Sequence, residues 1–289
     1  MTSAPRFVEE LVPTADGTQL ALRRYSGTGH LIVALHGFTG NGATMAELVE
    51  RSRGDRPALL VDLIGHGKSD SPAHPESYSM ASVVDQVLSI IGPHQPGTVH
   101  LLGYSMGGRI ALSMAARAPW YFGSVTTISS SPGIADPVER QERQRSDLAL
   151  ADHLDEIGLD AFVDEWLALD LFVPYRASLD DAAFTSTRQQ RLTNSVLGLA
   201  SSLRGTGTGS MPPLWTALRS IRTPLLAIAG SLDAKYVAIA KAVAETAHDG
   251  RSAIVEGVGH VTHVENCHAV AAQVAEFLKV CESDGHLSG

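Results

Sequence analysis

One serine of this chain stands in a context that favours catalysis. The segment Val99–Ala111 runs from an apolar stretch through Gly103-Tyr104-Ser105-Met106-Gly107 into a stretch rich in Ala, Ser and Met. This Gly-x-Ser-x-Gly pattern lies between a predicted strand and a predicted helix, where its glycines permit a tight turn that exposes the serine hydroxyl. The start of the helix then points its N–H groups at developing negative charge. We therefore predict that Ser105 is the reactive residue, although the same pattern outside this context would indicate only a turn.

A histidine and an aspartate follow Ser105 at positions that suit a catalytic triad. His260 comes just after the apolar run Ala253–Val255, and Asp233 comes just after the apolar run Leu225–Ala229. Because the carboxyl ends of parallel strands meet at one edge of a sheet, both side chains can reach a serine at that edge. In the fold that carries its serine on such a strand–turn–helix motif, the triad residues follow along the chain in the order serine, acid, histidine. Asp233 would orient the imidazole of His260 and stabilise its protonated form.

Other histidines and aspartates compete for these two roles. The chain has 12 histidines. Of these, His263 and His268 fall in or beside the predicted last helix, so we expect surface or capping positions for them. His66 lies in a tight glycine-rich turn and precedes the serine. Asp136 is the main rival for the acid because it follows another predicted strand, whereas Asp62 is expected to be structural.

Two backbone N–H groups are expected to form an oxyanion hole. The apolar run Leu31–Leu35 is followed by His36-Gly37-Phe38-Thr39-Gly40. A loop after such a strand supplies one donor, and the residue after the nucleophile supplies the other. The candidates are therefore Phe38 and Met106, and each such donor contributes roughly 3 kcal/mol to stabilising a transition state. His36 itself is expected to be structural.

Apolar runs alternate with helical patterns along most of the chain. An opening hairpin is predicted at 7–11 and 20–25 around Asp16-Gly17, followed by strands at 31–35, 58–63, 99–102, 125–128, 225–229 and 253–255. Helices are predicted at about 42–52, 78–91, 106–118, 235–248 and 266–281. This alternation predicts a mostly parallel sheet with helices on both faces. Together with the serine motif, it favours the α/β-hydrolase fold.

One long segment interrupts the alternation. Residues 131–212 show helical periodicity and charge but no convincing strand. We predict a core made of residues 1–130 and 213–289, with residues 131–212 as a helical cap. Such a cap would lie over the carboxyl edge of the sheet, where ligands bind in open α/β sheets. The glycine-rich run Gly205–Ser210 is predicted to be a flexible hinge or loop.

The composition of the chain excludes several classes of function. With 289 residues, 44% of them apolar and 18% charged, the chain can bury one large core. A net charge of −9 gives no general attraction to nucleic acid or acidic membranes. We expect a cytoplasmic protein, because no apolar run could span a bilayer and the start lacks a signal-peptide pattern. The two cysteines and the histidines lack metal-ligand spacing, so neither a disulfide nor a metal site is predicted.

Arginines gather in one segment of this acidic chain. Between Glu139 and Arg204 they occupy positions 140, 143, 145, 176, 188, 191 and 204. Arginines gathered in this way can mark the binding site of an anionic ligand. For most of these seven, a solvated helix surface is the simpler explanation.

The motifs together resemble a known family, the 2-succinyl-6-hydroxy-2,4-cyclohexadiene-1-carboxylate synthases of menaquinone biosynthesis, called MenH. The resemblance extends from about Leu31 to Leu278 and includes the nucleophile segment up to Arg109. Motifs of the fold alone would not separate this family from esterases, whereas Arg109 and the cap motifs are more specific. The other matching segments are residues 35–40, 62–67, 139–147, 203–209 and 260–266.

The resemblance implies a lyase reaction. Members of the family expel pyruvate from a succinyl-cyclohexene carboxylate by 2,5-elimination, and the triad serine removes a carbon-bound proton. His260 would raise the basicity of Ser105, and the oxyanion hole would hold the enolate-like charge that forms. No cofactor is implied. The implied partner is a small polycarboxylate substrate.

The resemblance also implies which residues bind that substrate. Arg109 matches the arginine that follows the glycines of the nucleophile segment, Arg143 matches a cap arginine, and Arg191 matches a third arginine. Trp166 matches a cap tryptophan that lines the pocket, and Tyr104 directly precedes the nucleophile. Planar guanidinium groups suit carboxylates because they bind both oxygens at once.

Two other functions stay open at this point. The same triad could hydrolyse an ester, a lactone or a carbon–carbon bond, with Ser105 as a covalent nucleophile. A binding protein or receptor on the same fold is disfavoured because all three triad positions are filled. The arginines discriminate between lyase and hydrolase, since neutral esters do not need them. The sequence gives no oligomeric state.

Overall fold

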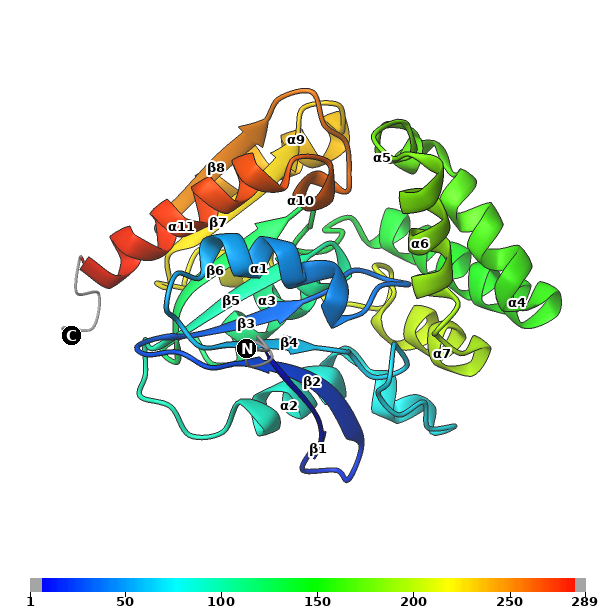
Figure 1. Ribbon diagram of the computed structural model, residues 1–289, viewed down its shortest axis with the longest axis horizontal. Helices are drawn as coiled ribbons and strands as arrows, with labels where there is room; N and C mark the ends of the chain where they lie inside the picture. Colours follow the sequence, from blue (N-terminus) through cyan, green and yellow to red (C-terminus); the bar gives the residue numbers. More distant parts are fainter. Residues whose placement is uncertain (1–6, 284–289) are drawn as a thin grey trace, which may run out of the picture.

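The computed structural model describes residues 7–283 and arranges them around one eight-stranded sheet (Figure 1). The strands are β1 (Val8–Pro13), β2 (Gln19–Tyr25), β3 (Leu31–Leu35), β4 (Ala58–Val61), β5 (Val99–Tyr104), β6 (Phe122–Ile128), β7 (Leu225–Gly230) and β8 (Gly250–Val255). The helices of the core are η1 (Gly42–Met45), α1 (Ala46–Ser52), η2 (Pro75–Tyr78), α2 (Met80–Ile91), α3 (Met106–Arg117), α8 (Trp215–Leu218), α9 (Ala234–Thr246), α10 (Thr262–Glu265) and α11 (Cys267–Ser283). Between β6 and β7 lie α4 (Pro137–Ala168), η3 (Asp170–Phe172), α5 (Val173–Ala177), α6 (Asp181–Arg191) and α7 (Val196–Thr206).

The strand order of the sheet is β1-β2-β4-β3-β5-β6-β7-β8. The hairpin of β1 and β2 is antiparallel, and β2 pairs antiparallel with β4, whereas the strands from β4 to β8 run parallel. The carboxyl ends of β3, β5, β6, β7 and β8 therefore share one edge. Loops that leave these strands meet at that edge.

Helices cover both faces of the sheet because the inner strands are apolar on both sides. On β3, Leu31, Val33 and Leu35 pack into one core cluster with residues of α2, α3 and α9. The alternate residues Ile32 and Ala34 pack into a second cluster with α1 and α11. Successive side chains of a strand point to opposite faces, so a fully buried parallel strand is a continuous apolar run. The predicted α/β-hydrolase fold is confirmed.

The segment between β6 and β7 is helical and lies beside the core in Figure 1. The long helix α4 packs on α7, and the two share a small apolar cluster that includes Ala151, Leu154, Phe162 and Leu203. A break at Gly158, whose φ of 77° favours glycine, divides α4 into two arms. The division into a core and a 131–212 cap stays a prediction.

The glycine-rich run near residue 207 is packed more closely than the sequence suggested. Helix α7 continues through Thr206, and a Cβ atom added at Gly205 would lie 2.2 Å from the carbonyl oxygen of Tyr78. One added at Gly209 would lie 2.2 Å from the backbone nitrogen of Gln144. The predicted loop is confirmed for residues 207–210, which form a turn, whereas Gly205 and Thr206 belong to α7. The glycines of the run allow backbones to approach each other.

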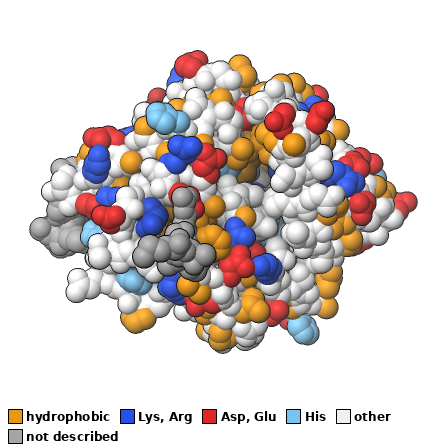
Figure 2. All heavy atoms as spheres, in the orientation of Figure 1, with side chains coloured by type: hydrophobic (Ala, Val, Ile, Leu, Met, Phe, Trp, Pro, Cys, Tyr) orange, Lys and Arg blue, Asp and Glu red, His pale blue; other side chains and the backbone are white. Residues whose placement is uncertain are grey.

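The surface drawn in Figure 2 carries acidic and basic side chains in a mixed pattern. Within residues 7–283, no helix is both long enough and apolar enough to cross a membrane.

Candidate active site

Ser105 occupies a strained turn between β5 and α3. Its φ of 48° and ψ of −107° lie where residues other than glycine are uncommon. The turn is tight because a Cβ atom at Gly103 would lie 2.4 Å from the carbonyl oxygen of Gly107, and one at Gly107 would lie 2.2 Å from that of Leu35. The two glycines of the motif thus let strand and helix approach each other. Strain of this kind at an exposed hydroxyl is typical of a reactive position.

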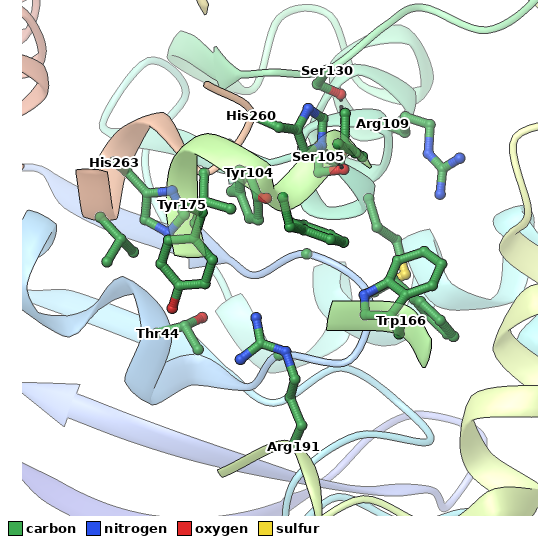
Figure 3. Close-up of a pocket in the computed structure, with 18 of the residues that line it drawn as sticks. Thr44, Tyr104, Ser105, Arg109, Ser130, Trp166, Tyr175, Arg191, His260 and His263 are labelled. Atoms are coloured by element: carbon green, nitrogen blue, oxygen red, sulfur yellow. Dashed lines mark hydrogen bonds between the residues drawn. The ribbon is translucent and has the colours of Figure 1, made fainter. Parts of the chain in front are cut away.

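The three predicted triad residues meet at the carboxyl edge of the sheet. Figure 3 shows two of them, Ser105 and His260, next to each other. Nδ1 of His260 lies 2.8 Å from Oδ2 of Asp233, and Nε2 lies 3.3 Å from Oγ of Ser105. A carboxylate can only accept, so the proton of the neutral imidazole is on Nδ1. Nε2 is then free to accept the proton of the serine hydroxyl. Asp233 follows β7 and His260 follows β8, which is how the fold brings them together.

Aromatic rings hold the imidazole of His260 in place. The rings of Tyr236, Tyr104 and Phe172 lie with their centroids 4.7, 5.7 and 6.4 Å from that of His260. His260 is only 3% exposed, so bulk water does not compete for its hydrogen bonds. Asp233 is fixed as well, because its Oδ1 accepts from the backbone N–H of Tyr236 at 3.3 Å.

The rival acids have structural contacts. Asp136 caps α4, where its Oδ1 accepts from the backbone N–H groups of Val138 and Glu139. Asp62 accepts from the N–H groups of Gly42 and Lys68 at 2.7 and 2.9 Å. Neither aspartate bonds to His260. Their contacts stabilise a helix start and a turn.

The predicted oxyanion-hole residues both border the site. Phe38 and Met106 line the cavity that contains Ser105, and their role as donors stays a prediction. His36 is buried between two loops, where Nδ1 donates to the carbonyl of Gly37 at 2.8 Å and Nε2 accepts from the N–H of Leu63 at 3.0 Å. These bonds hold the loop after β3 in position. His36 therefore has the structural surroundings that the sequence predicted for it.

A cavity of about 570 Å³ lies between the triad and the helices that follow β6. Ser105 and His260 form part of its floor, and α4, α6 and α7 contribute residues to the opposite wall. Its size suits a small organic molecule. All five residues predicted to bind substrate line this cavity, namely Tyr104, Arg109, Arg143, Trp166 and Arg191.

Two arginines of the cavity, the half-buried Arg109 and the buried Arg191, have no carboxylate partner among residues 7–283. Arg109 on α3 donates through Nη1 to the hydroxyl of Thr208, and burial lowers its pKa to about 10. Arg191, at the end of α6 and 8% exposed, donates to the carbonyl of Thr187, and burial lowers its pKa as well. The Nε atoms of both are buried without a hydrogen-bond partner among residues 7–283. Both remain cations near neutral pH, so the cavity has unpaired positive charge.

The third predicted arginine is different, because it already has an acidic partner. Nε of Arg143 lies 2.7 Å from Oδ1 of Asp147, and its side chain is 41% exposed. The buried Asp147 also accepts from the N–H of Gly209, which fixes the carboxylate and thereby the arginine. Arg143 can still offer its two terminal nitrogens to the cavity.

Aromatic side chains form the apolar part of the cavity. The ring of Trp166 packs against Phe38, Phe172 and Phe162 at centroid distances of 5.2, 5.7 and 6.0 Å. Its Nε1–H is buried without a partner in the described chain, so it can donate to a ligand. The ring of Tyr104 lies beside the triad, and burial raises the pKa of its hydroxyl.

Comparisons with known proteins agree with this geometry. Residues 30–266 match the family model for the alpha/beta hydrolase fold. The chain is 31% identical to 2-succinyl-6-hydroxy-2,4-cyclohexadiene-1-carboxylate synthase of Klebsiella pneumoniae (strain 342), over 86% of this chain and 93% of that protein. It is 35% identical to a Bacillus subtilis (strain 168) protein that bears the same name provisionally, over 92% of this chain and 97% of that one. The chain belongs to this synthase family.

A solved structure of a family member supports the assignment. The structure of MenH from S. aureus superimposes with a TM-score of 0.83 at 32% identity, covering 90% of this chain and 98% of that one. The resemblance predicted from the motifs is therefore confirmed.

The cavity is also lined by residues that were not predicted to lie there, and these include His263, Thr208, Tyr175 and Tyr236. His263 was expected at the surface but is 2% exposed, and its ring lies 4.3 Å from that of Tyr104, so that prediction was wrong. Thr208 lies in the glycine-rich run, and Tyr175 projects from α5 (Figure 3). Tyr236 follows Asp233 closely. The one sequence signal that could have indicated a cavity position for His263 was its place three residues after His260.

Two other arginines of the segment, Arg188 and Arg204, form ion pairs at the protein surface. Arg188 pairs with Asp164 at 2.6 Å, and Arg204 pairs with Asp152 and Asp155 at 2.6 and 2.7 Å. Each lies on the outside of the helices between β6 and β7. For these arginines the simpler explanation of a solvated surface is correct.

Three buried histidines predict how the synthase responds to acid. Burial lowers the pKa of His36 to about 4 and, chiefly by the same cause, that of His66 and of His263 to about 3. In the unfolded chain each binds a proton as the pH falls through about 6.5. The unfolded state then binds more protons than the folded state, so stability falls as the pH drops from 6.5 toward 4, by about 1.4 kcal/mol per pH unit for each histidine.

Melting temperatures measured from pH 8 to pH 5 test this. We expect a plateau above pH 7 and a steady decrease below 6.5. Carboxylates with a lowered pKa, such as Asp16 and Glu282 at about 2, change the stability only at a pH below this range. His66→Asn should reduce the slope by the contribution of one histidine, whereas replacing the exposed His74 by alanine should not change it. A melting temperature that is constant from pH 8 to 5 would contradict the prediction.

Proposed function

We propose that this chain eliminates pyruvate from 2-succinyl-5-enolpyruvyl-6-hydroxy-3-cyclohexene-1-carboxylate, giving 2-succinyl-6-hydroxy-2,4-cyclohexadiene-1-carboxylate in menaquinone biosynthesis. The observation that carries the proposal is a pair of cavity arginines without carboxylate partners among residues 7–283, Arg109 and Arg191, whose Nε atoms are buried in the same cavity as a complete triad. The names of the relatives at 31% and 32% identity support the same reaction.

The charge of the cavity favours an anionic substrate. A buried cation without a partner is unfavourable, since it loses the solvation that water would give. A substrate carboxylate at Arg109 or Arg191 would supply the missing partner through charge-assisted hydrogen bonds. Neutral esters would leave both arginines unpaired. The arginines thus favour the lyase over the hydrolase alternative.

Proton transfer follows from the distances in the triad. Nε2 of His260 takes the hydroxyl proton of Ser105, and the resulting alkoxide removes the proton from the ring carbon next to the succinyl carbonyl. Asp233 stabilises the imidazolium that forms. The negative charge moves onto the succinyl oxygen as an enolate, and the backbone N–H groups of Phe38 and Met106 would donate hydrogen bonds to that oxygen.

Collapse of this enolate completes the reaction. The ring double bond shifts, the carbon–oxygen bond at ring position 5 breaks, and the side chain leaves as the enolate of pyruvate. That enolate takes up one proton, and the proton held on His260 supplies it. No water is consumed, and the products together contain all atoms of the substrate.

The helical segment 131–212 would act as a cap that closes the cavity. It contributes Arg143, Trp166, Arg191 and Thr208 to the wall opposite the triad. Closure over a substrate would exclude water, which strengthens the ion pairs inside and protects the enolate.

A coupled assay tests the proposed function. The unstable substrate is generated in place, the protein is added, and pyruvate release is followed in the presence of excess precursor. Release far above the spontaneous rate supports the proposal. Release at the spontaneous rate, together with rapid hydrolysis of short activated esters, would favour the hydrolase alternative.

The hydroxyl of Thr208 gives a milder test of the arginine site. Thr208→Val keeps the shape of the side chain but removes the acceptor for Nη1 of Arg109. We expect KM for the substrate to rise about tenfold with a smaller change in kcat, because one bond to a charged group orients the guanidinium. Thr246→Val on α9, whose hydroxyl bonds to the carbonyl of Ala242, is the matched control. An unchanged KM in Thr208→Val would show that the threonine does not orient Arg109.

A further inference from the structure

Three possible metal ligands meet at the edge of the sheet opposite the triad. His30 directly precedes β3, His100 lies near the start of β5, and Glu282 lies near the end of α11. One nitrogen of each imidazole and one carboxylate oxygen lie within 4.8 Å of one another. The three residues are far apart in the sequence, so the spacing rules that predicted no metal site could not detect them.

The distances within this cluster are those of a tetrahedral zinc site. Nδ1 of His30 lies 3.0 Å from Nε2 of His100, and Oε1 of Glu282 lies 3.4 Å from Nε2 of His100 and 3.7 Å from Nδ1 of His30. For zinc bonds of about 2.0–2.1 Å, tetrahedral geometry places ligand atoms about 3.3–3.4 Å apart. We propose that His30, His100 and Glu282 form a binding site for Zn²⁺.

Neighbouring residues hold the ligands in suitable orientations. Nδ1 of His100 lies 2.8 Å from the hydroxyl of Ser124, a contact that can leave the Nε2 lone pair directed at the metal. Arg56 donates to both oxygens of Glu282 at 2.6 and 2.5 Å. This bidentate pair holds the carboxylate in place beside the two imidazoles.

A hollow of about 280 Å³ leads to the cluster, and its lining includes His30, Glu282, Arg56 and Asp55. An ion can enter there, and water can take the fourth coordination position, as in zinc sites with three protein ligands. The positive charge of Arg56 repels a cation that binds close to it. Asp55 offsets part of that charge, because it brings a further carboxylate to the same hollow.

Binding requires the rearrangement of one proton. The contact between His30 and His100 joins two ring nitrogens, so one of these nitrogens carries a proton and the other accepts it. When Zn²⁺ takes the position between them, that proton moves to the far nitrogen of its own ring, and both near nitrogens become ligands. No proton is lost overall, since both rings are neutral before and after binding. The ion would join the end of α11 to β3 and β5.

Titration of the full, untagged chain with zinc tests the proposal. Isothermal titration at pH 7.5 should show one equivalent of Zn²⁺ bound by the wild type, with a rise in melting temperature. His30→Ala and Glu282→Gln should each bind zinc at least about tenfold more weakly. His74→Ala, which removes an exposed histidine next to Glu76, should bind as the wild type does.

Two results would overturn the proposal. One is the absence of a bound equivalent in the wild type, which would leave the cluster as a salt bridge around Arg56 and Glu282. The other is equal binding by the wild type and His30→Ala, which would place the ion elsewhere. If the variants do not fold, X-ray absorption of the wild-type zinc complex decides instead, since two imidazoles and one carboxylate at about 2.0–2.2 Å give a distinct pattern.

Discussion

Replacing Ser105 by alanine is expected to reduce catalysed pyruvate release by about 10³-fold or more, close to the spontaneous rate. Ser105 lies 3.3 Å from Nε2 of His260, and alanine leaves the imidazole without a hydroxyl to deprotonate. The remaining groups of the cavity can still bind the substrate. We therefore expect kcat to fall strongly, with a small change in substrate affinity, as measured by steady-state kinetics and by equilibrium binding of the diene product.

Ser146→Ala is the matched control for this experiment. Ser146 also lines the cavity, but its hydroxyl bonds to the carbonyl of Glu142 within α4. Its removal should leave kcat nearly unchanged. A Ser105→Ala protein that retains a tenth or more of the wild-type kcat would contradict the role of Ser105 as the base.

Replacing either buried arginine by methionine is the second change with a large expected effect. Arg109→Met and Arg191→Met each remove a cation that a substrate carboxylate would pair with in a dry cavity. Loss of such a partner costs about 2–4 kcal/mol, a decrease of about 30- to 1000-fold in kcat/KM. The melting temperature should stay level or rise, because each change removes a buried charge that has no acidic partner in the free protein.

Arg188→Met separates this effect from a general loss of charge. Arg188 lies on the same helix as Arg191 but pairs with Asp164 outside the cavity. We expect kcat/KM to change less than twofold in this variant. If the three arginine variants lost activity equally, the cavity arginines would have no special role in recognising carboxylates.

The triad was predictable because its signals are local. Ser105 lies within a glycine pattern that favours a tight turn, and Asp233 and His260 each follow an apolar run that forms a strand, β7 and β8 respectively. The topology of a parallel sheet then brings the three loops to one edge. No contact between distant residues had to be known in advance to place them together.

Residues that depend on packing between distant segments could not be predicted in this way. The Gly205–Ser210 run suggested mobility, yet Gly209 is required by the close approach of α4, and this approach positions Thr208 against Arg109. His263 was expected at the surface because it falls in or beside the predicted last helix. In the structure a short helix, α10, precedes the final helix, and His263 is buried against Tyr104. Periodicity over a few residues does not carry that information.

The ring product of the reaction tests the central claim most directly. Elimination and hydrolysis of the enol ether both release pyruvate, but they leave different rings. Elimination with Ser105 as the base gives a conjugated cyclohexadiene, whose mass equals that of the substrate minus pyruvate and which absorbs in the ultraviolet. We expect this diene from the wild-type protein. A ring product heavier by one water molecule, without the diene absorbance, would contradict the elimination and establish hydrolysis.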